Sequence, residues 1–88
     1  MPTAPTATLA VRVLLFASYA ENLGLDSLEL SFDQPTKVMD VLNRLRALPG
    51  GERLPSRPMC AINLAQVPLN ASLSDGDELA ILPPLAGG

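Results

Sequence analysis

Histidine is missing from this chain of 88 residues, and there is one cysteine. The lack of histidine excludes Ser-His-Asp catalysis, histidine acid–base chemistry and histidine metal sites. A single cysteine, Cys60, allows no internal disulfide and no thiolate metal cluster, which fits a reducing cytoplasm. Because its neighbours are apolar, we expect Cys60 to be a buried small hydrophobic residue rather than a nucleophile.

Long apolar runs and basic stripes are also missing. No apolar run reaches the roughly 18–20 residues that span a bilayer, so we expect no membrane partner. The N-terminus lacks the features of a secretory signal, so we expect a cytoplasmic protein. Six basic and nine acidic residues give a net charge of -3, and the scattered basic residues argue against a nucleic-acid partner. No Gly-rich phosphate-binding loop joins a strand to a helix.

Two segments near the start alternate with the period of a β-strand. In residues 8–17 every second side chain is small or aliphatic, which predicts a strand with one face in the core. These residues are Leu9, Val11, Val13, Leu15 and Ala17. Leu14 and Phe16 make the other face apolar towards its end. Residues 27–33 predict a second, half-buried strand in a hairpin with the first, and residues 18–24 predict a turn or one helical turn.

Residues 34–51 contain the one helix that we expect. Pro35 and Thr36 mark its start, with Thr36 as the N-cap. Aliphatic residues then recur at helical spacing and predict a buried stripe. They are Val38, Val41, Leu42, Leu45 and Leu48. The helix ends at Pro49, Gly50 and Gly51.

The second half predicts short strands and one tight turn. Residues 59–69 predict a strand, a turn near Asn63 and another short extended segment around Val67. Ser74–Glu78 contains paired acids, but the further ligands of a calcium loop are missing. We therefore interpret it as a turn, with Gly76 at positive φ.

Residues 78–82 predict the last strand, whose pairing should end near Leu82 because Pro83 and Pro84 have no N–H groups. Several strands with one helix to cover the sheet predict an α+β fold. The expected organisation is a disordered N-terminal lead-in over residues 1–7, one domain over residues 8–82 and an extended, flexible tail over residues 83–88.

The tail is the strongest functional signal in the sequence. The residues that lead to the terminal carboxylate have small side chains or none, namely Ala86, Gly87 and Gly88. Prolines favour an extended backbone, and the segment from Pro83 to Gly88 can reach about 20 Å. Such a tail can enter the active site of another protein. The hypothesis is that Gly88, activated with ATP as an acyl-adenylate, is the reactive residue of a carrier.

Three stretches resemble the small subunit of molybdopterin synthase, a family of sulfur carriers with the ubiquitin-like β-grasp fold. They are "VRVLLFASYAENLG", "CAINLAQV" and, as the most specific, "LSDGDELAILPPLAGG". The strand followed by two prolines, two residues and two glycines is typical of this family. The related thiazole-pathway sulfur carriers are an alternative, because they share the turn and the Gly pair, but they usually lack the two prolines.

The resemblance implies a reaction and a set of partners. An adenylating enzyme of the ubiquitin-activating type would adenylate Gly88, and sulfur from a donor protein would replace AMP to leave a thiocarboxylate. Pro83, Pro84, Leu85, Ala86 and Gly87 would form the tail that enters the large subunit, where sulfur passes to a cyclic pterin precursor. The large subunit would supply the catalytic side chains in an assembly of two small and two large subunits. The resemblance implies no stably bound cofactor.

The resemblance also suggests a docking surface. In a β-grasp sheet the first and last strands are neighbours, so Phe16 and Leu82 would form an exposed apolar patch beside the root of the tail. The alternative is that a loop covers them. Gln66 is polar where we expect an apolar contact in this family.

Two other functions use the same sequence features. A ubiquitin-like modifier would join Gly88 to lysines of target proteins, and Lys37, the chain's only lysine, would limit chain-building. A plain binding module would not need the tail.

Overall fold

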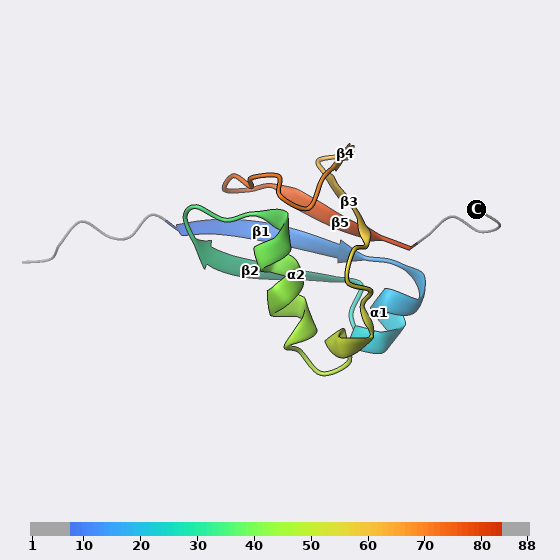
Figure 1. Cartoon of the computed structure of the whole chain (residues 1–88). Coiled ribbons are helices and arrows are strands. Elements are labelled where there is room, and N and C mark those ends of the chain that lie inside the picture. The colour runs from blue at the N-terminus through green and yellow to red at the C-terminus, as the bar shows by residue number, and fades with distance from the viewer. Residues whose placement is uncertain (1–7, 84–88) are drawn as a thin grey trace, which may run out of the picture.

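The computed structural model describes residues 8–83, which form a mixed five-stranded sheet, two α-helices and a 3-10 turn (Figure 1). In chain order the elements are β1 (Thr8–Leu15), α1 (Ala17–Leu23), β2 (Ser27–Asp33), α2 (Val38–Arg46), η1 (Gly51–Arg53), β3 (Met59–Ile62), β4 (Ala65–Val67) and β5 (Glu78–Leu82). This is the expected α+β class. No helix in residues 8–83 has the length and apolar character to cross a membrane.

The strands lie in the order β2-β1-β5-β3-β4. Strand β1 pairs with β2 in an antiparallel hairpin and with β5 in a parallel ladder. Strand β3 is antiparallel to both β5 and β4. The expected strands are therefore confirmed, and the first and last strands of the chain are neighbours. Strand β5, which leads into the tail, is held on both sides by other strands.

Strand β1 ends at Leu15, so the expectation that Ala17 faces the core is wrong. The carbonyl of Phe16 accepts hydrogen bonds from the N–H groups of Tyr19 and Ala20 at 3.1 and 3.4 Å, and this turns the chain into a helix. Ala17 has φ +51° and is exposed. The four preceding residues of the predicted face are buried as expected, namely Leu9, Val11, Val13 and Leu15.

The segment expected to be a turn or one helical turn forms the seven-residue helix α1. Tyr19 is buried, and Ala20 and Leu23 pack partly buried against the core. Gly24 ends the helix with φ +75°, and its N–H donates to the carbonyl of Ala20 at 2.9 Å. The apolar positions are too few and the segment is too short for periodicity to reveal this helix.

Helix α2 begins one residue later than expected, because Lys37 and not Thr36 is its N-cap. The buried Thr36 hydroxyl donates a hydrogen bond of 2.6 Å to the carbonyl of Asp33, so it ties down the preceding loop instead. The Asp40 carboxylate accepts the backbone N–H of Lys37 at 2.8 Å, which places a negative charge at the helix start.

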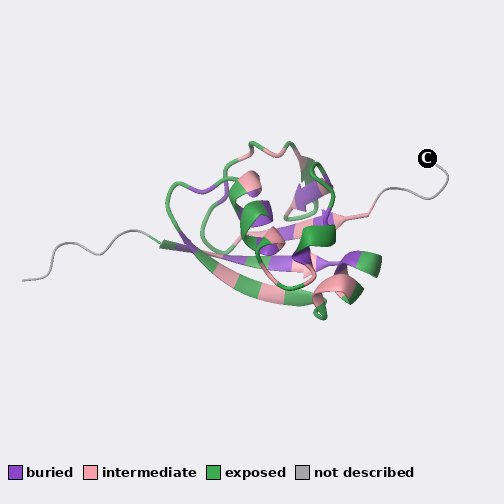
Figure 2. Ribbon diagram, turned by 60° about the horizontal axis from the view of Figure 1, so that its bottom comes forward, coloured by how far each residue is buried: buried purple, intermediate pink, exposed green. Residues whose placement is uncertain are grey.

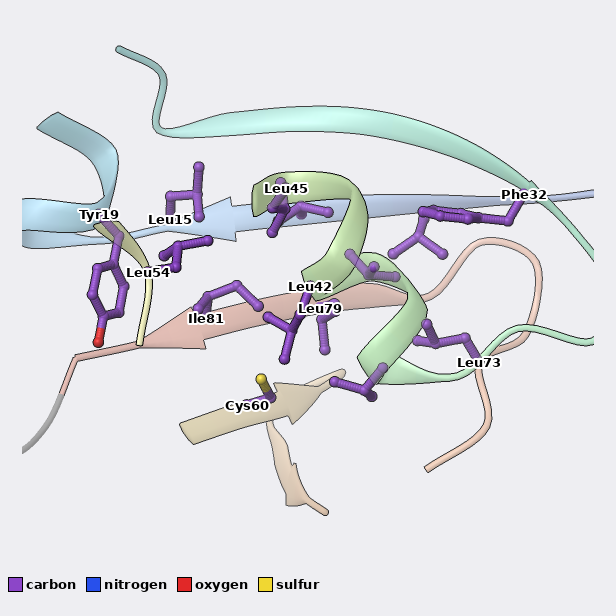
Figure 3. Close-up of a cluster of buried hydrophobic side chains, with 14 of the residues drawn as sticks. Leu15, Tyr19, Phe32, Leu42, Leu45, Leu54, Cys60, Leu73, Leu79 and Ile81 are labelled. Atoms are coloured by element: carbon purple, nitrogen blue, oxygen red, sulfur yellow. The ribbon is translucent and has the colours of Figure 1, made fainter. Parts of the chain in front are cut away.

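The core lies between α2 and one face of the sheet. The stripe residues Val38, Val41, Leu42 and Leu45 are all fully buried, and Leu48 is half-buried. Figure 3 shows Leu42 and Leu45 in the same cluster as Leu15, Leu79 and Ile81. Figure 2 shows the alternation of buried and less buried residues along β1 that follows from this one-sided packing.

The Gly pair after α2 is required by backbone packing. Gly50 has φ +88°, and a Cβ there would lie 1.8 Å from the carbonyl oxygen of Asn22 in α1. A Cβ on Gly51 would lie 1.8 Å from the carbonyl oxygen of Leu45. Both distances are far below van der Waals contact, so only glycine fits at either position. The expectation that the Gly pair ends α2 is wrong, because the helix ends at Arg46 with Ala47 as its C-cap. The pair instead lets the chain pass close to α1.

Candidate functional site

The site begins where β5 ends. Leu82 pairs with Met59 of β3, and Ile81 pairs with Leu15 of β1, so the ladders close at Leu82 as expected. Pro83 follows and is half-buried. Because β5 lies between β1 and β3, the tail starts from an interior strand of the sheet. Pro84, Leu85, Ala86, Gly87 and Gly88 lie outside the described residues.

The face of the sheet that does not pack on α2 is apolar near this end. Its residues come from β1, β5 and β3, and they alternate with the core residues of those strands. Leu14 is paired with Ala80, Ala80 with Ala61, and Leu82 with Met59. We call Leu14, Met59, Ala61, Ala80 and Leu82 the open-face patch. Ala61 is buried but outside the core cluster, and the other four are partly exposed.

Phe16 lies beside this patch. The last pair of the β1–β5 ladder is Leu15 with Ile81, and Phe16 and Leu82 are the residues that follow on each strand. The structure therefore brings the two predicted docking residues to the same end of neighbouring strands. Phe16 is 42% exposed, whereas Leu82 is half-buried. Their role in docking stays a prediction.

A cavity of about 400 Å³ adjoins Leu82. Tyr19 of α1 and the loop that contains Pro55 and Pro58 form one part of its wall, and Met59 forms another. Gln66 also lines it and pairs with Ala61 of the open-face patch. The polar residue noted in the sequence is therefore at the border of the patch, where its amide is exposed.

Cys60 is a core residue, as expected. It is 1% exposed, and its thiol lies 3.7 Å from the carbonyl oxygen of Pro58. Burial raises its pKa from 9.0 to about 11, so the thiol is protonated and unreactive near neutral pH. Burial also raises the pKa of Tyr19, and the nearby Cys60 adds to this effect.

The acidic turn before β5 has a structural role. Asp75 accepts the backbone N–H of Ala10 at 2.7 Å, and Asp77 accepts the backbone N–H of Ser74 at 2.8 Å. Gly76 has φ +87°, as predicted for a tight turn. In residues 8–83 no three histidine, cysteine or acidic side chains gather where they could hold a metal ion.

The sequence pattern missed part of this surface. Met59 and Ala61 belong to the open-face patch through β3, a strand of only four residues, where alternation gives a weak signal. The pairing of β3 with β5, which sequence periodicity does not reveal, brings them beside Ala80 and Leu82.

Comparison with known proteins points to one family. A model described as the ThiS family matches residues 13–88. The molybdopterin synthase sulfur carrier subunit of Escherichia coli (strain K12) is 33% identical over 81 residues, which cover 89% of this chain and 99% of that protein. The corresponding subunit of Arabidopsis thaliana is 32% identical over 84 residues, covering 94% of this chain and 88% of that protein.

Solved structures agree on the fold. SAMP1 from Haloferax volcanii superimposes with a TM-score of 0.77 at 30% identity, covering 90% of this chain and 99% of that one. A complex of subunits 1 and 2 of the molybdopterin-converting factor from Helicobacter pylori 26695 contains a chain with a TM-score of 0.67 at 22% identity, covering 91% of this chain and all of that one. The fold is the ubiquitin-like β-grasp, and with a match over residues 13–88 this chain belongs to the ThiS family.

Proposed function

We propose that this chain is the sulfur carrier of a molybdopterin synthase and that Gly88 carries the sulfur. The observation that carries the proposal is the match of the family model through residue 88, in a chain whose last strand ends at Leu82. The relatives named as molybdopterin synthase sulfur carrier subunits match nearly the whole chain, which supports the same role here.

The chemistry takes place at the main-chain carboxylate of Gly88. A carboxylate oxygen attacks the α-phosphorus of ATP on an adenylating enzyme, and pyrophosphate leaves. A sulfide-level sulfur atom from a donor protein then attacks the carbonyl carbon, AMP leaves, and a thiocarboxylate remains. The thiocarboxylate sulfur attacks a carbon of the pterin precursor, and a carbon–oxygen bond at that carbon breaks so that the oxygen leaves. Water then cleaves the resulting thioester, which leaves the sulfur on the pterin and restores the Gly88 carboxylate.

The side chains of the scaffold fit a carrier that leaves catalysis to its partners. Cys60 is buried, with a pKa of about 11, and is a poor nucleophile. Asp75 and Asp77 bond backbone N–H groups of their own turn and its neighbour. The large subunit therefore supplies the acid–base groups for sulfur transfer.

The open-face patch and Phe16 form the docking surface for the large subunit. They adjoin the root of the tail, so binding there directs residues 83–88 into the partner's active site. The Helicobacter pylori complex joins subunits 1 and 2 of the molybdopterin-converting factor, which supports a large-subunit partner. The assembly that follows from the family contains two small and two large subunits.

Reconstitution with an adenylating enzyme, ATP and a sulfide source tests the proposal. Intact-mass analysis should show a gain equal to the mass difference between sulfur and oxygen, and fragmentation should place it on Gly88. The thiocarboxylate form should then convert the pterin precursor when the large subunit is added. No mass gain, or a gain on Cys60, would contradict the proposal.

A ubiquitin-like modifier is the second candidate. The small archaeal modifier protein 1 from Methanosarcina acetivorans is 30% identical, with a TM-score of 0.74. A modifier would give conjugates larger than the chain instead of the small mass gain. A binding module, in contrast, would keep full activity after deletion of Gly87 and Gly88.

A further inference from the structure

The turn between β3 and β4 has an unusual residue at its tip. Ile62 pairs with Ala65, so Asn63 and Leu64 form a two-residue hairpin turn. Their φ values are +48° and +76°. Turns of this kind favour asparagine followed by glycine, because both residues must adopt positive φ. Asn63 fits the turn, whereas Leu64 occupies the position where glycine would avoid backbone strain.

Packing within the chain does not explain this leucine. Leu64 is 94% exposed, more than twice the exposure of Phe16 or Leu25, the other exposed large hydrophobic residues of the described chain. An exposed leucine in a left-handed conformation contributes strain and little burial to the folded state. A contact outside the chain would explain why the side chain is apolar.

The turn is also held rigidly. The backbone N–H of Asn63 donates to the carbonyl of Glu78 at 2.8 Å, and its Oδ1 accepts the N–H of Glu78 at 2.9 Å. Its Nδ2 donates to the Asp77 carboxylate at 3.0 Å. These bonds fix the tip to the start of β5. The backbone that carries Leu64 is therefore held in place, which lowers the entropy cost of binding.

The tip lies at the end of β3 that is farther from the tail. Met59 pairs with Leu82 at the tail end of β3, and Ile62 pairs with Leu79 towards the tip. Leu64 thus follows the far end of the strand that carries Met59 and Ala61. The Asp77 carboxylate accepts a hydrogen bond from the Asn63 side chain, so a negative charge lies beside the turn. The whole chain has a net charge of -3, which is complementary to a basic partner surface.

We propose that Leu64 is an anchor residue that inserts into an apolar pocket with a basic border on the large subunit of molybdopterin synthase. The inference rests on the proposed function, because it extends the same docking surface. It supplies apolar contact two residues from Gln66, the polar residue at the border of the patch. A few side chains that fill desolvated pockets carry most of the binding energy of an interface.

Stability and affinity should respond in opposite ways to Leu64→Gly. Glycine accepts positive φ without strain, so the Tm of the free chain should stay constant or rise by a few degrees. Loss of the anchor should weaken binding to the large subunit about tenfold or more in a calorimetric titration. Leu64→Met keeps an apolar side chain and should bind within about threefold of the wild type. The wild-type affinity should fall as salt is raised.

The outcomes separate this inference from the proposed function. If the wild type binds the large subunit and Leu64→Gly binds equally well, the anchor is contradicted and the proposed function stands. If the wild type does not bind, both are contradicted. A salt-independent affinity would contradict the basic border. A change in the oligomeric state of the isolated Leu64→Gly chain would show that the residue contacts a second copy, and would overturn the assignment to the large subunit.

Discussion

The chain contains two Gly pairs that follow proline, and they differ in what surrounds them. At Gly50 and Gly51 the space of a Cβ is occupied by backbone oxygens 1.8 Å away. Gly87 and Gly88 follow the last strand and its prolines, within the stretch that the ThiS family model matches. The same dipeptide therefore has a packing explanation in one place, and in the other we propose a chemical one. Position in the fold, and not the motif, distinguishes them.

Deletion of Gly87 and Gly88 should have the largest effect on function. The shortened tail presents its carboxylate several ångströms from the reacting centre of each partner, and misplacement by 1 Å can cost about 100-fold. We expect sulfur loading and pterin conversion to fall by more than about 100-fold, with an unchanged Tm. Intact mass and a pterin conversion assay measure the loss. If the deletion variant is loaded with sulfur as well as the wild type, the terminal Gly pair has no chemical role that distinguishes it from the internal pair.

Substitution of the internal pair should have the reverse effect. Gly50→Ala places a Cβ against the Asn22 carbonyl at φ +88°, so we expect a loss of roughly 3–4 kcal/mol of unfolding free energy. Denaturant unfolding measures this loss. The folded fraction should still accept sulfur on Gly88 normally.

Gly24→Ala is the matched control, because Gly24 has φ +75° but nothing within 4 Å of the added Cβ. It should lose only about 1 kcal/mol, from backbone strain alone. Equal losses in the two variants would show that strain, and not the close approach to α1, explains Gly50.

Most of the scaffold could be predicted from the sequence, because its signals are local. The alternation in residues 27–33 gave β2 with its observed bounds, and helical spacing gave the buried face of α2. Local sequence signals failed where tertiary contacts determine the conformation of the chain. Thr36 resembles an N-cap but bonds the Asp33 carbonyl, and α1 depends on burial of Tyr19 against the core.

The site could be predicted only in part for the same reason. The ends of β1 and β5 were expected to lie together, and the parallel ladder confirms this. The contribution of β3 to the open-face patch depends on long-range pairing that no short pattern contains. The left-handed conformation of Leu64 also required the structure, because "NL" is not a typical turn sequence.

Charges on the docking surface should reduce partner affinity without affecting the tail. In Phe16→Asp and Leu82→Asp the apolar contact is replaced by a carboxylate that loses solvation in the complex. We expect each change to weaken binding to the large subunit by about 10- to 100-fold, while adenylate-dependent sulfur loading of Gly88 is measured separately. A Thr8→Asp variant, at the exposed far end of β1, controls for added charge. Unchanged affinity of the two docking variants would reject this surface.

The smallest expected effect concerns Cys60, which carries the chain's one thiol. Its folded-state pKa of about 11 exceeds the ordinary value of 9.0, so the unfolded chain loses this proton at lower pH than the folded chain. The stability that the neutral thiol contributes is present below pH 9.0 and is lost as the pH rises towards 11. Between pH 8 and 10 we expect a decrease of about 1 kcal/mol, measured by urea unfolding, which Cys60→Ala should lack. The same variant should still gain sulfur on Gly88. If it does not, sulfur loading of Gly88 depends on the Cys60 thiol. The contrast between a Gly pair that serves packing and a Gly pair that serves chemistry would then fail, because a core residue would also take part in the chemistry.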